Sequence, residues 1–287
     1  MNDHCFFVSD LHGKIERYEK LFEKIEQDRP GAVFFGGDLV PAGIAKALKM
    51  RDKYEDFVNQ YLAKQFMELK SKMKQAYPEV FIILGNDDPR IEEESFQFYE
   101  KKGLWKYMHM KSADLDGYTI YGYSYVPPTP FMMKDWERYD MSRYVDPGCA
   151  HPTEGFRTVK MKEDIEFETI RNDLQNLTGN KDLSKSIFLF HSPPYKTFLD
   201  RAALDDVVID HVPADVYVGS IAIKELLEER NPYITLHGHI HESSRITGHW
   251  KEKINNTWAF SAAYEGEQLA IVQFNLSNPS DAGRIIL

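Results

Sequence analysis

The chain has 287 residues, enough for one large domain or two small ones, and its 43% hydrophobic and 13% aromatic content is ordinary for a globular protein with a substantial core. Its 45 acidic and 35 basic residues give a net charge of -10, and the average field of such a chain repels polyanions, which argues against non-specific binding of DNA or RNA. The two cysteines, Cys5 and Cys149, are too few for a disulfide framework or a thiolate zinc site.

The first predicted elements are two short apolar strands and an amphipathic helix. Residues 5–9 (CFFVS) and 32–38 (AVFFGGD) are apolar enough to be buried strands. Between them, residues 14–27 place apolar side chains on one face at helical spacing. This order of strand, helix and strand predicts an α/β fold.

A long helical pattern follows the second strand. Residues 42–77 repeat apolar side chains at spacings of three and four among many charges, and Pro78 ends the pattern. We expect one long amphipathic helix or a helical pair, inserted between strands, with enough apolar surface to serve as a dimer face in a homo-oligomer. The next strand is predicted at residues 79–86, and a short helix at 91–103 ends at Gly103.

The middle of the chain contains a long segment without a clean period. Residues 118–123 (YTIYGY) alternate like a half-buried strand, whereas residues 124–160 are rich in Tyr, Trp and Met and show neither periodicity. We expect an ordered loop there, because a loop of this length in a compact domain is usually functional or mobile. A helix from about residue 159 to 177 then leads to a strand at 186–192.

The last part of the chain is predicted to be mostly β. A second loop, to about residue 219, precedes a helix at 220–230 and a strand at 233–238. Antiparallel strands are expected at residues 243–250, 253–260 and 268–276. Because no repeat or linker interrupts the chain, we expect one domain over residues 1–287, with a helical insertion at about 42–77 and loop insertions at about 124–160 and 193–218.

Polar side chains follow five of the predicted strands directly, at the carboxyl ends where ligands of α/β sheets bind. Each alone has a structural explanation, as a turn residue, a helix cap or a hydrogen-bonded histidine. Five coincidences of residue type and position favour a metal site instead. The residues are Asp10, His12, Asp38, Asn86, Asp87, Asp88, His191, His239 and His241.

The donor types in this set limit the metal. Imidazoles mixed with carboxylate and amide oxygens suit Mn, Fe, Zn, Co or Ni better than Ca or a thiolate-bound ion. Two divalent ions about 3.5–4 Å apart, bridged by one carboxylate, would lower the pKa of a water between them and hold a phosphoryl group.

The order of these motifs resembles the signature of the calcineurin-like metallophosphoesterases, over residues 8 to 241. The matching motifs are Asp10-Leu-His12, Gly37-Asp38, Gly85-Asn86-Asp87-Asp88, His191 and Gly238-His239-Ile240-His241. The resemblance implies a four-layer α/β/β/α sandwich and two divalent metal ions. It implies that Asp10, His12 and His241 hold one ion. It also implies that Asn86, His191 and His239 hold the other and that Asp38 bridges both.

The implied reaction is hydrolysis of a phosphate ester by attack of a metal-bridging hydroxide on phosphorus. The alternative is a non-catalytic member that resembles the retromer scaffold subunit and binds other proteins. The intact ligand set favours the enzyme. His237 precedes the last motif and is expected to be a core histidine or to support a ligand.

One catalytic position departs from the family pattern. The family usually has histidine after the asparagine, where it helps to bind phosphate and protonates the leaving group, and this chain has Asp87. Asp88 matches the carboxylate that orients that histidine. Beside two cations the pKa of Asp87 should lie below the usual value of about 3.9, so it could not donate a proton. We therefore expect phosphodiesters with acidic leaving groups to be preferred, unless His151 or His211 replaces the acid.

The two loop insertions supply a predicted substrate wall, at residues 124–150 and 193–218. Their aromatic residues would stack a flat group, and basic residues would pair with phosphate, which suits a small phosphorylated substrate such as a nucleotide. The alternative is that the aromatic residues only pack the loop onto the domain. The basic residues concerned are Lys134, Arg138, Arg143, Lys196 and Arg201.

The sequence also predicts a protein that neither spans nor binds a membrane. No apolar run approaches the roughly 18 residues of a membrane helix, and the N-terminus lacks the basic flank and apolar stretch of a signal peptide. We therefore expect a cytoplasmic protein without a membrane partner.

Overall fold

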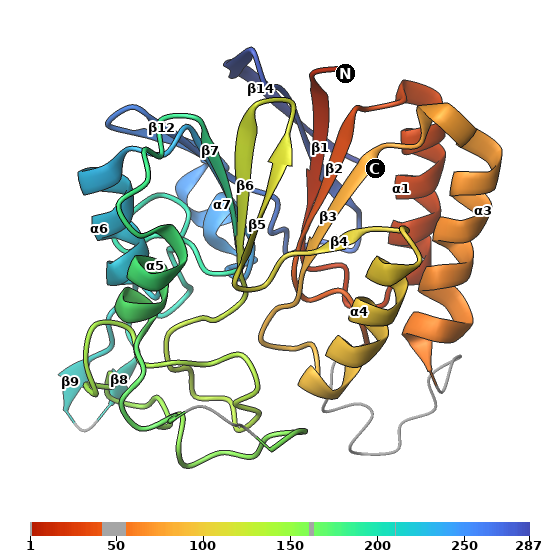
Figure 1. Cartoon of the computed structure of the whole chain (residues 1–287). Coiled ribbons are helices and arrows are strands. Elements are labelled where there is room, and N and C mark those ends of the chain that lie inside the picture. The colour runs from red at the N-terminus through yellow and green to blue at the C-terminus, as the bar shows by residue number, and fades with distance from the viewer. Residues whose placement is uncertain (1, 42–55, 161–163, 210) are drawn as a thin grey trace.

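The short apolar segments form the centres of two six-stranded sheets in the computed structural model, which describes residues 2–41, 56–160, 164–209 and 211–287 (Figure 1). In spatial order, the first sheet contains β14 (Asn278–Ile286), β13 (Ala270–Asn275), β1 (His4–Val8), β2 (Ala32–Gly36), β3 (Glu79–Ile83) and β4 (Lys106–Tyr107). The second contains β11 (Lys251–Ile254), β12 (Thr257–Ser261), β10 (Ile234–His237), β7 (Ser186–Phe190), β6 (Tyr118–Tyr123) and β5 (Lys111–Leu115).

Helices cover the outer face of each sheet and complete four layers (Figure 1). On the first sheet lie α1 (Ile15–Asp28), a helical run of η1 (Val58–Leu62), α3 (Ala63–Met73) and η2 (Lys74–Ala76), and η3 (Arg90–Glu92) with α4 (Glu93–Lys101). On the second lie α5 (Ile170–Thr178) and α6 (Ile221–Arg230). The short elements are α7 (Ser243–Thr247) and a small hairpin of β8 (Val208–Ile209) and β9 (Val212–Pro213). This is the α/β/β/α sandwich that the sequence predicts.

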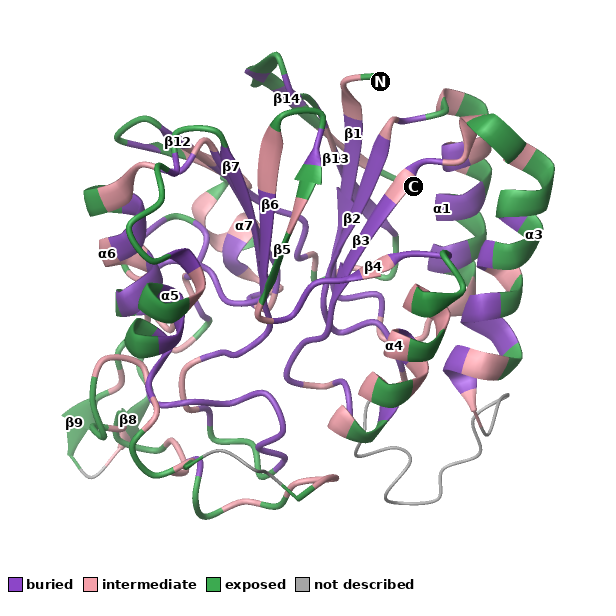
Figure 2. Ribbon diagram, in the orientation of Figure 1, coloured by how far each residue is buried: buried purple, intermediate pink, exposed green. Residues whose placement is uncertain are grey.

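Successive side chains of the central strands point to opposite faces of the first sheet, so they contribute to two hydrophobic cores. Phe7, Phe34 and Phe81 face the second sheet, where the ring of Phe34 stacks on that of Phe81 at 5.2 Å. Phe6 and Phe35, the neighbours along the strands, face the helices instead. The central strands β1, β2, β3, β7 and β10 are buried along nearly their whole length, while the outward faces of the helices are exposed (Figure 2). Burial on both faces explains why these strands are almost wholly apolar.

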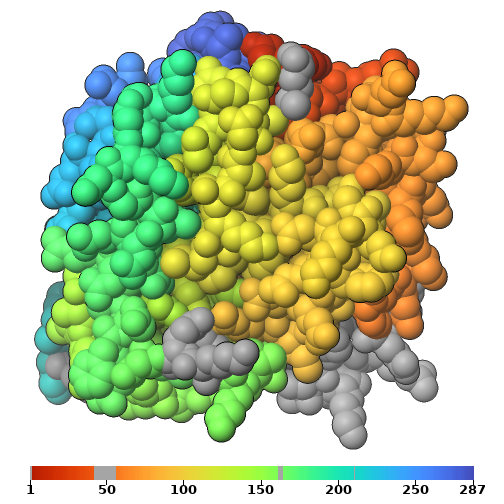
Figure 3. All heavy atoms as spheres, viewed as in Figure 1, coloured from red at the N-terminus to blue at the C-terminus, as the bar shows by residue number. Residues whose placement is uncertain are grey.

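The chain passes between the sheets where β4 ends and β5 begins. Met108 still donates its N–H to Ile82 of the first sheet, at 2.8 Å, while Met110 donates to Gly122 of the second, at 2.9 Å. A side chain at Gly122 would meet the backbone of Met108, so glycine permits this close approach. On the face shown in Figure 3, the yellow band of α4, β4, β5 and β6 closes this side of the sandwich.

Buried carboxylates hold the long loops in place. Asp135 accepts the N–H of Arg90 and that of Thr158, both at 2.8 Å, which ties the loop after β6 to the start of α4. Asp140 accepts the hydroxyl of Ser220 at 2.6 Å and so fixes the same loop to the start of α6. As predicted, residues 124–160 form no helix or extended strand of their own.

Three predicted elements differ from the structure. The helix expected from about residue 159 begins only at Ile170, because Thr169 is extended and its hydroxyl caps the helix by accepting the N–H of Asn172 at 3.1 Å. Residues 243–250 are not a strand: Ser243–Thr247 form the helix α7, which ends at Gly248. Residues 253–260 are a hairpin rather than one strand, since Asn255 has a positive φ and turns the chain between β11 and β12.

The apolar face of the helical insertion packs against the rest of the protein. The predicted stretch at residues 42–55 lies outside the described residues, and the remainder is helical from Val58 to Ala76. The ring of Phe66 packs edge-on against that of Phe22 at 5.1 Å, and Tyr61 packs against Tyr18. This face is therefore not left for a dimer contact in the described part. Among the described helices, none is long and apolar enough to cross a membrane, and a cytoplasmic location stays a prediction.

Truncation of a side chain in the core between the sheets should lower the stability of the protein. Phe34 is fully buried, and its ring also packs against that of Phe274. We expect Phe34→Ala to lower the free energy of unfolding by about 3–5 kcal/mol, measured from the urea midpoint at unchanged slope. The control Phe98→Ala removes a half-exposed ring and should cost less than about 1 kcal/mol. Equal losses for the two variants would contradict this account of the core.

Candidate metal centre

Five strand ends meet at one edge of the sandwich. β1, β2 and β3 are parallel neighbours in the first sheet, and β7 and β10 are parallel neighbours in the second. Their carboxyl ends therefore point the same way within each sheet. The turns that follow them carry Asp10 and His12, Asp38, Asn86, His191, and His239 and His241.

The backbone turns sharply at several of these residues. Asp10, His12, Asp38 and His239 all have left-handed backbone conformations, with φ of 58°, 47°, 54° and 75°. Such a conformation costs a non-glycine residue roughly 1 kcal/mol or more. The turns are held by backbone hydrogen bonds, in which Asp10 donates to Gly37 at 2.9 Å and His12 to Asp38 at 2.8 Å. The fold thus holds strained turns that aim these side chains at one point.

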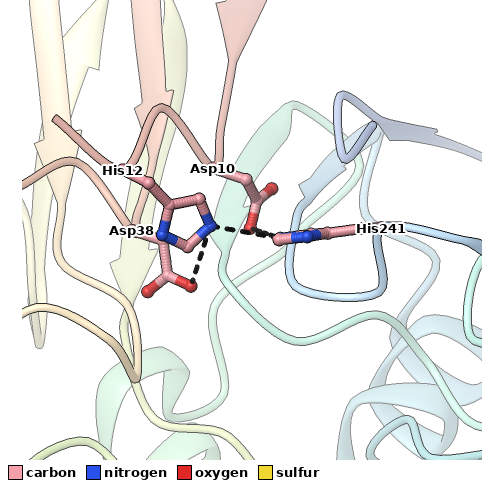
Figure 4. A group of neighbouring side chains, drawn as sticks. All are labelled: Asp10, His12, Asp38 and His241. Atoms are coloured by element: carbon pink, nitrogen blue, oxygen red, sulfur yellow. Dashed lines mark hydrogen bonds and ion pairs between the residues drawn. The ribbon is translucent and has the colours of Figure 1, made fainter. Parts of the chain in front are cut away.

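Four of the side chains form a compact cluster (Figure 4). Donor atoms of Asp10, His12, Asp38 and His241 all lie within 4.8 Å of one another. His241 Nε2 is 3.1 Å from Asp10 Oδ1 and 3.3 Å from His12 Nε2, and His12 Nε2 is 4.0 Å from Asp38 Oδ2. Two imidazoles whose ring nitrogens face each other between carboxylates suit a shared cation better than a hydrogen bond.

A second group adjoins the first through Asp38. His191 Nε2 lies 3.3 Å from Asp38 Oδ2 and 2.9 Å from Asn86 Oδ1. The ring of His239 lies beside that of His191, with centroids 5.1 Å apart, and its backbone N–H donates to Asp10 Oδ1 at 3.1 Å. The structure thus brings together all seven residues that the sequence predicts as metal ligands, with Asp38 between the two groups.

The surroundings of His191 orient its ring. Nδ1 lies 2.7 Å from the carbonyl oxygen of Gly36 and donates a hydrogen bond to it, while Nε2 faces Asn86 and Asp38. A metal-binding histidine commonly donates its other N–H in this way. A Cβ at Gly37 would lie 2.7 Å from His191 Nδ1, which explains why a residue without a side chain stands there. These contacts fit a metal ligand.

The charges of the cluster are mutually dependent. Although burial opposes it, the Asp38 carboxylate raises the pKa of His191 to about 10, and His191 in turn lowers the pKa of Asp38 to about 2. Burial alone would raise the pKa of Asp10, but His241 beside it holds that pKa well below its usual value. Burial and the nearby His191 lower the pKa of His239 to about 3, which leaves a neutral imidazole.

Asp87 lies at the mouth of this centre. Its backbone N–H donates to Asp38 Oδ1 at 2.8 Å, and its side chain is about one third exposed, with Oδ2 3.6 Å from His12 Nδ1. Among the protein's own groups, burial and the Asp38 carboxylate raise the pKa of Asp87 to about 7. Divalent cations would act in the opposite direction.

Asp88 is fully buried, and its side chain accepts hydrogen bonds from three backbone N–H groups. Its Oδ1 accepts the N–H groups of Leu39 and Val40, both at 2.8 Å, and its Oδ2 accepts the N–H of Gly85 at 2.9 Å. Burial and the nearby Asp38 raise its pKa, against these hydrogen bonds. Asp88 therefore fastens the turn after β3 to the turn after β2. These contacts give Asp88 a positioning role, and a catalytic role for Asp88 stays a prediction.

The remaining histidines lie away from the centre. His237 Nδ1 is 2.9 Å from the carbonyl oxygen of Ser192, and its Nε2 is 2.8 Å from the Thr235 hydroxyl, so both ring nitrogens have protein partners. His151 contacts the Tyr139 hydroxyl at 3.1 Å, and His211 is exposed. Neither His151 nor His211 lines the cleft at the metal centre, so the structure does not place them as replacements for the acid.

An open cleft of about 720 Å³ leads to the cluster. His12, Asp38, Asn86 and Asp87 form its floor, together with His239 and His241. Its walls come from both predicted loop insertions, for example Pro127, Tyr144, Tyr195 and Tyr217. The sequence could indicate these loops by their length and composition, but not which of their side chains face the cleft.

The predicted phosphate-binding residues of these loops are engaged elsewhere. Lys134 is buried with its Nζ 2.6 Å from Glu137, and Arg138 is buried 2.9 Å from Asp173. None of Lys134, Arg138, Arg143, Lys196 and Arg201 lines the cleft. Trp136 and Tyr139 are also buried, so these two aromatic residues pack the loop onto the domain, as the alternative interpretation expects. The structure does not place these basic residues on the cleft: four of them pair with carboxylates, and Lys196 Nζ lies 5.1 Å from the centre of the Tyr195 ring.

Sequence comparison agrees with this geometry. The model of the family described as calcineurin-like phosphoesterase matches residues 5–243, which include all five motifs. The chain belongs to this family. It is thus a metal-dependent phosphoesterase of a dimetal family, a hydrolase that acts on phosphoric ester bonds.

Solved structures of similar fold support the architecture. A Thermus thermophilus protein, TT1561, shares 15% sequence identity at a TM-score of 0.58, over 100% of this chain and 99% of that chain. A dimetal phosphatase from Danio rerio shares 10% at a TM-score of 0.53, over 95% of this chain and 92% of that chain. At such identities the likeness concerns the fold alone. None of the curated proteins compared matches the sequence.

Removing the charge of Asp38 should empty the centre. We expect Asp38→Asn to lose metal and activity together, because an amide cannot neutralise two cations that share it. Metal content per chain and turnover, measured on protein purified without chelator, check this. The control Asp28→Asn alters a partly exposed carboxylate paired with Lys24 and should keep both. Two ions and full turnover in Asp38→Asn would show that this assignment is wrong.

Metal binding should release a proton. Since the pKa of His191 is raised to about 10, this ring is protonated at neutral pH until an ion displaces the proton. The apparent affinity should therefore rise as pH rises towards 10, by about tenfold per unit for one proton released. Calorimetric titration at pH 7.5 in two buffers of different ionisation enthalpy measures the proton count. A count of zero would contradict the charge state given to His191.

Proposed function

We propose that this chain hydrolyses small phosphorylated substrates at a two-metal centre and prefers phosphodiesters to phosphomonoesters. The observation that carries the proposal is the position of Asp38, which reaches imidazoles of both sheets at once. One ion would be held by Asp10, His12, Asp38 and His241. The other would be held by Asp38, Asn86, His191 and His239.

The donor set supports transition ions at this centre. Four imidazoles with two carboxylates and one amide oxygen suit Mn, Fe, Zn, Co or Ni. When bound, two such ions supply a water of lowered pKa and neutralise charge on the phosphoryl group. The protein's own part is to fix the ligands: the Gly36 carbonyl holds the ring of His191, and the N–H of His239 holds Asp10.

Asp87 is the basis for the proposed preference. Its carboxylate lies on the floor of the cleft within 3.6 Å of His12, so a bound phosphoryl group at this centre would be close to it. Beside two cations we expect Asp87 to be ionised at neutral pH. Its repulsion then disfavours a dianionic monoester more than a monoanionic diester, and it cannot protonate a leaving group.

The preference can be tested with two substrate classes. The wild type should hydrolyse bis-aryl phosphodiesters with higher kcat/KM than alkyl phosphomonoesters. Asp87→His should narrow this gap by restoring general-acid help, an effect typically worth roughly 10²–10⁴-fold. Steady-state kinetics of both proteins with both substrates give the four constants required.

A matched control separates Asp87 from a general effect of an added imidazole. Asp114→His places the same change on an exposed position of β5, and it should leave both substrate constants unaltered. If the wild type prefers alkyl monoesters, the proposed preference is wrong. An unchanged ratio in Asp87→His would show that residue 87 does not act on the reacting phosphate.

A further inference from the structure

The cleft beside the metal centre is acidic. Asp87, Asp146, Asp215 and Glu242 line it, and among the described residues that line it there is no lysine or arginine. Two arginines of its loops pair outside it: Arg143 lies 2.9 Å from Glu166, and Arg201 pairs with Asp205. Lys196 does not line the cleft, although its Nζ lies 5.1 Å from the centre of the Tyr195 ring. A substrate with a second phosphate would thus meet carboxylates and no protein counter-charge in the described part of the cleft.

Two carboxylates of the loops, those of Asp146 and Asp215, line the same cleft. The hydroxyl of Tyr195 donates to Asp215 Oδ2 at 2.6 Å, which fixes this carboxylate at the wall. Partial burial and the charge of Asp215 together raise the pKa of Asp146, so the two side chains repel each other. A positive group between them would relieve that repulsion.

The walls around these carboxylates are apolar and aromatic. Tyr144 and Tyr217 line the cleft with Pro147 and Val218. Tyr144 is 69% exposed, a large aromatic surface left open at the mouth of the cleft. Aromatic faces combined with carboxylates attract alkylammonium groups, because the ring faces are negative and the methyl groups of the cation are apolar.

Resting on the proposed function, we propose that the substrate is a phosphate ester of an amino alcohol or of a quaternary-ammonium alcohol. Its phosphate lies at the metal centre, and its ammonium group lies between the tyrosines and the carboxylates of Asp146 and Asp215. Hydrolysis forms one P–O bond from water and breaks the P–O bond of the ester, and the leaving group departs as the alcohol or phenol with the proton released by that water.

Three synthetic diesters test the charge of the organic group. Each has p-nitrophenol as the leaving alcohol, and the second alcohol is choline, its uncharged isostere 3,3-dimethylbutanol, or an alcohol of similar size that bears a carboxylate. We expect kcat/KM to fall in that order, with choline ahead of the isostere by about tenfold at low ionic strength and less at high salt. Release of p-nitrophenol reports all three reactions.

Charge variants locate the effect in the cleft. Asp146→Asn combined with Asp215→Asn should reduce the ratio of the choline ester to its isostere to near unity, since the two changes remove both negative charges. The amide of Asp215→Asn keeps one of the two acceptor oxygens that bind the Tyr195 hydroxyl and the Tyr217 N–H. Asp206→Asn is the matched control, because Asp206 belongs to the same loop but does not line the cleft, and its ratio should equal that of the wild type. Thermal unfolding of each variant checks that the loops remain folded.

The outcomes separate the two proposals. Turnover of bis(p-nitrophenyl) phosphate with no preference for the choline ester, or with the carboxylate ester ahead, overturns the inference about the cleft and leaves the phosphodiesterase intact. An undiminished preference in the double variant overturns the role of Asp146 and Asp215. If metal-loaded protein hydrolyses none of the diesters, the proposed function fails and the inference fails with it.

Discussion

The contact of one buried carboxylate with imidazoles from both sheets is the interaction on which the site depends. Asp38 follows β2 of the first sheet, yet it lies 3.3 Å from His191, which follows β7 of the second. Burying a carboxylate and an imidazolium is costly unless each compensates the other. Two divalent ions would take over that compensation when they displace the proton. The two sheets are therefore joined at this edge by charge, in addition to the apolar core between them.

The central strands were predictable because their sequence signal is local. The runs that contain Phe6, Phe34 and Phe81 are buried on both faces, so they are almost wholly apolar. A short run of this composition is typical of a buried strand. The segment at 243–250 shows the limit of such reasoning. Its helix is short and lies between the motif that contains His239 and His241 and Gly248, and it contains too few residues to show a helical period.

The residues of the site were more predictable than the walls around it. Donor side chains that follow neighbouring parallel strands of one sheet meet at one edge, so strand order predicts that Asp10 and Asp38 lie together. His191 follows a strand of the other sheet, and its place beside Asp38 was implied by the family resemblance. The direction of a loop side chain has no such rule. Lys134 was expected at the substrate, but Glu137 three residues later buries it. Such pairing depends on how the loop folds over itself, which the sequence does not show.

The left-handed turns at the strand ends limit which residues can replace the donor side chains. Apart from glycine, asparagine, aspartate and histidine are among the residues that enter this backbone region most readily. Asp10, His12, Asp38 and His239 therefore satisfy two demands with one side chain, a donor atom for a cation and a tolerated turn. Alanine at any of them removes both properties at once and confounds chemistry with backbone strain. At Asp10 and Asp38, asparagine retains the turn and removes only the negative charge, so it is the replacement that isolates the role of that charge.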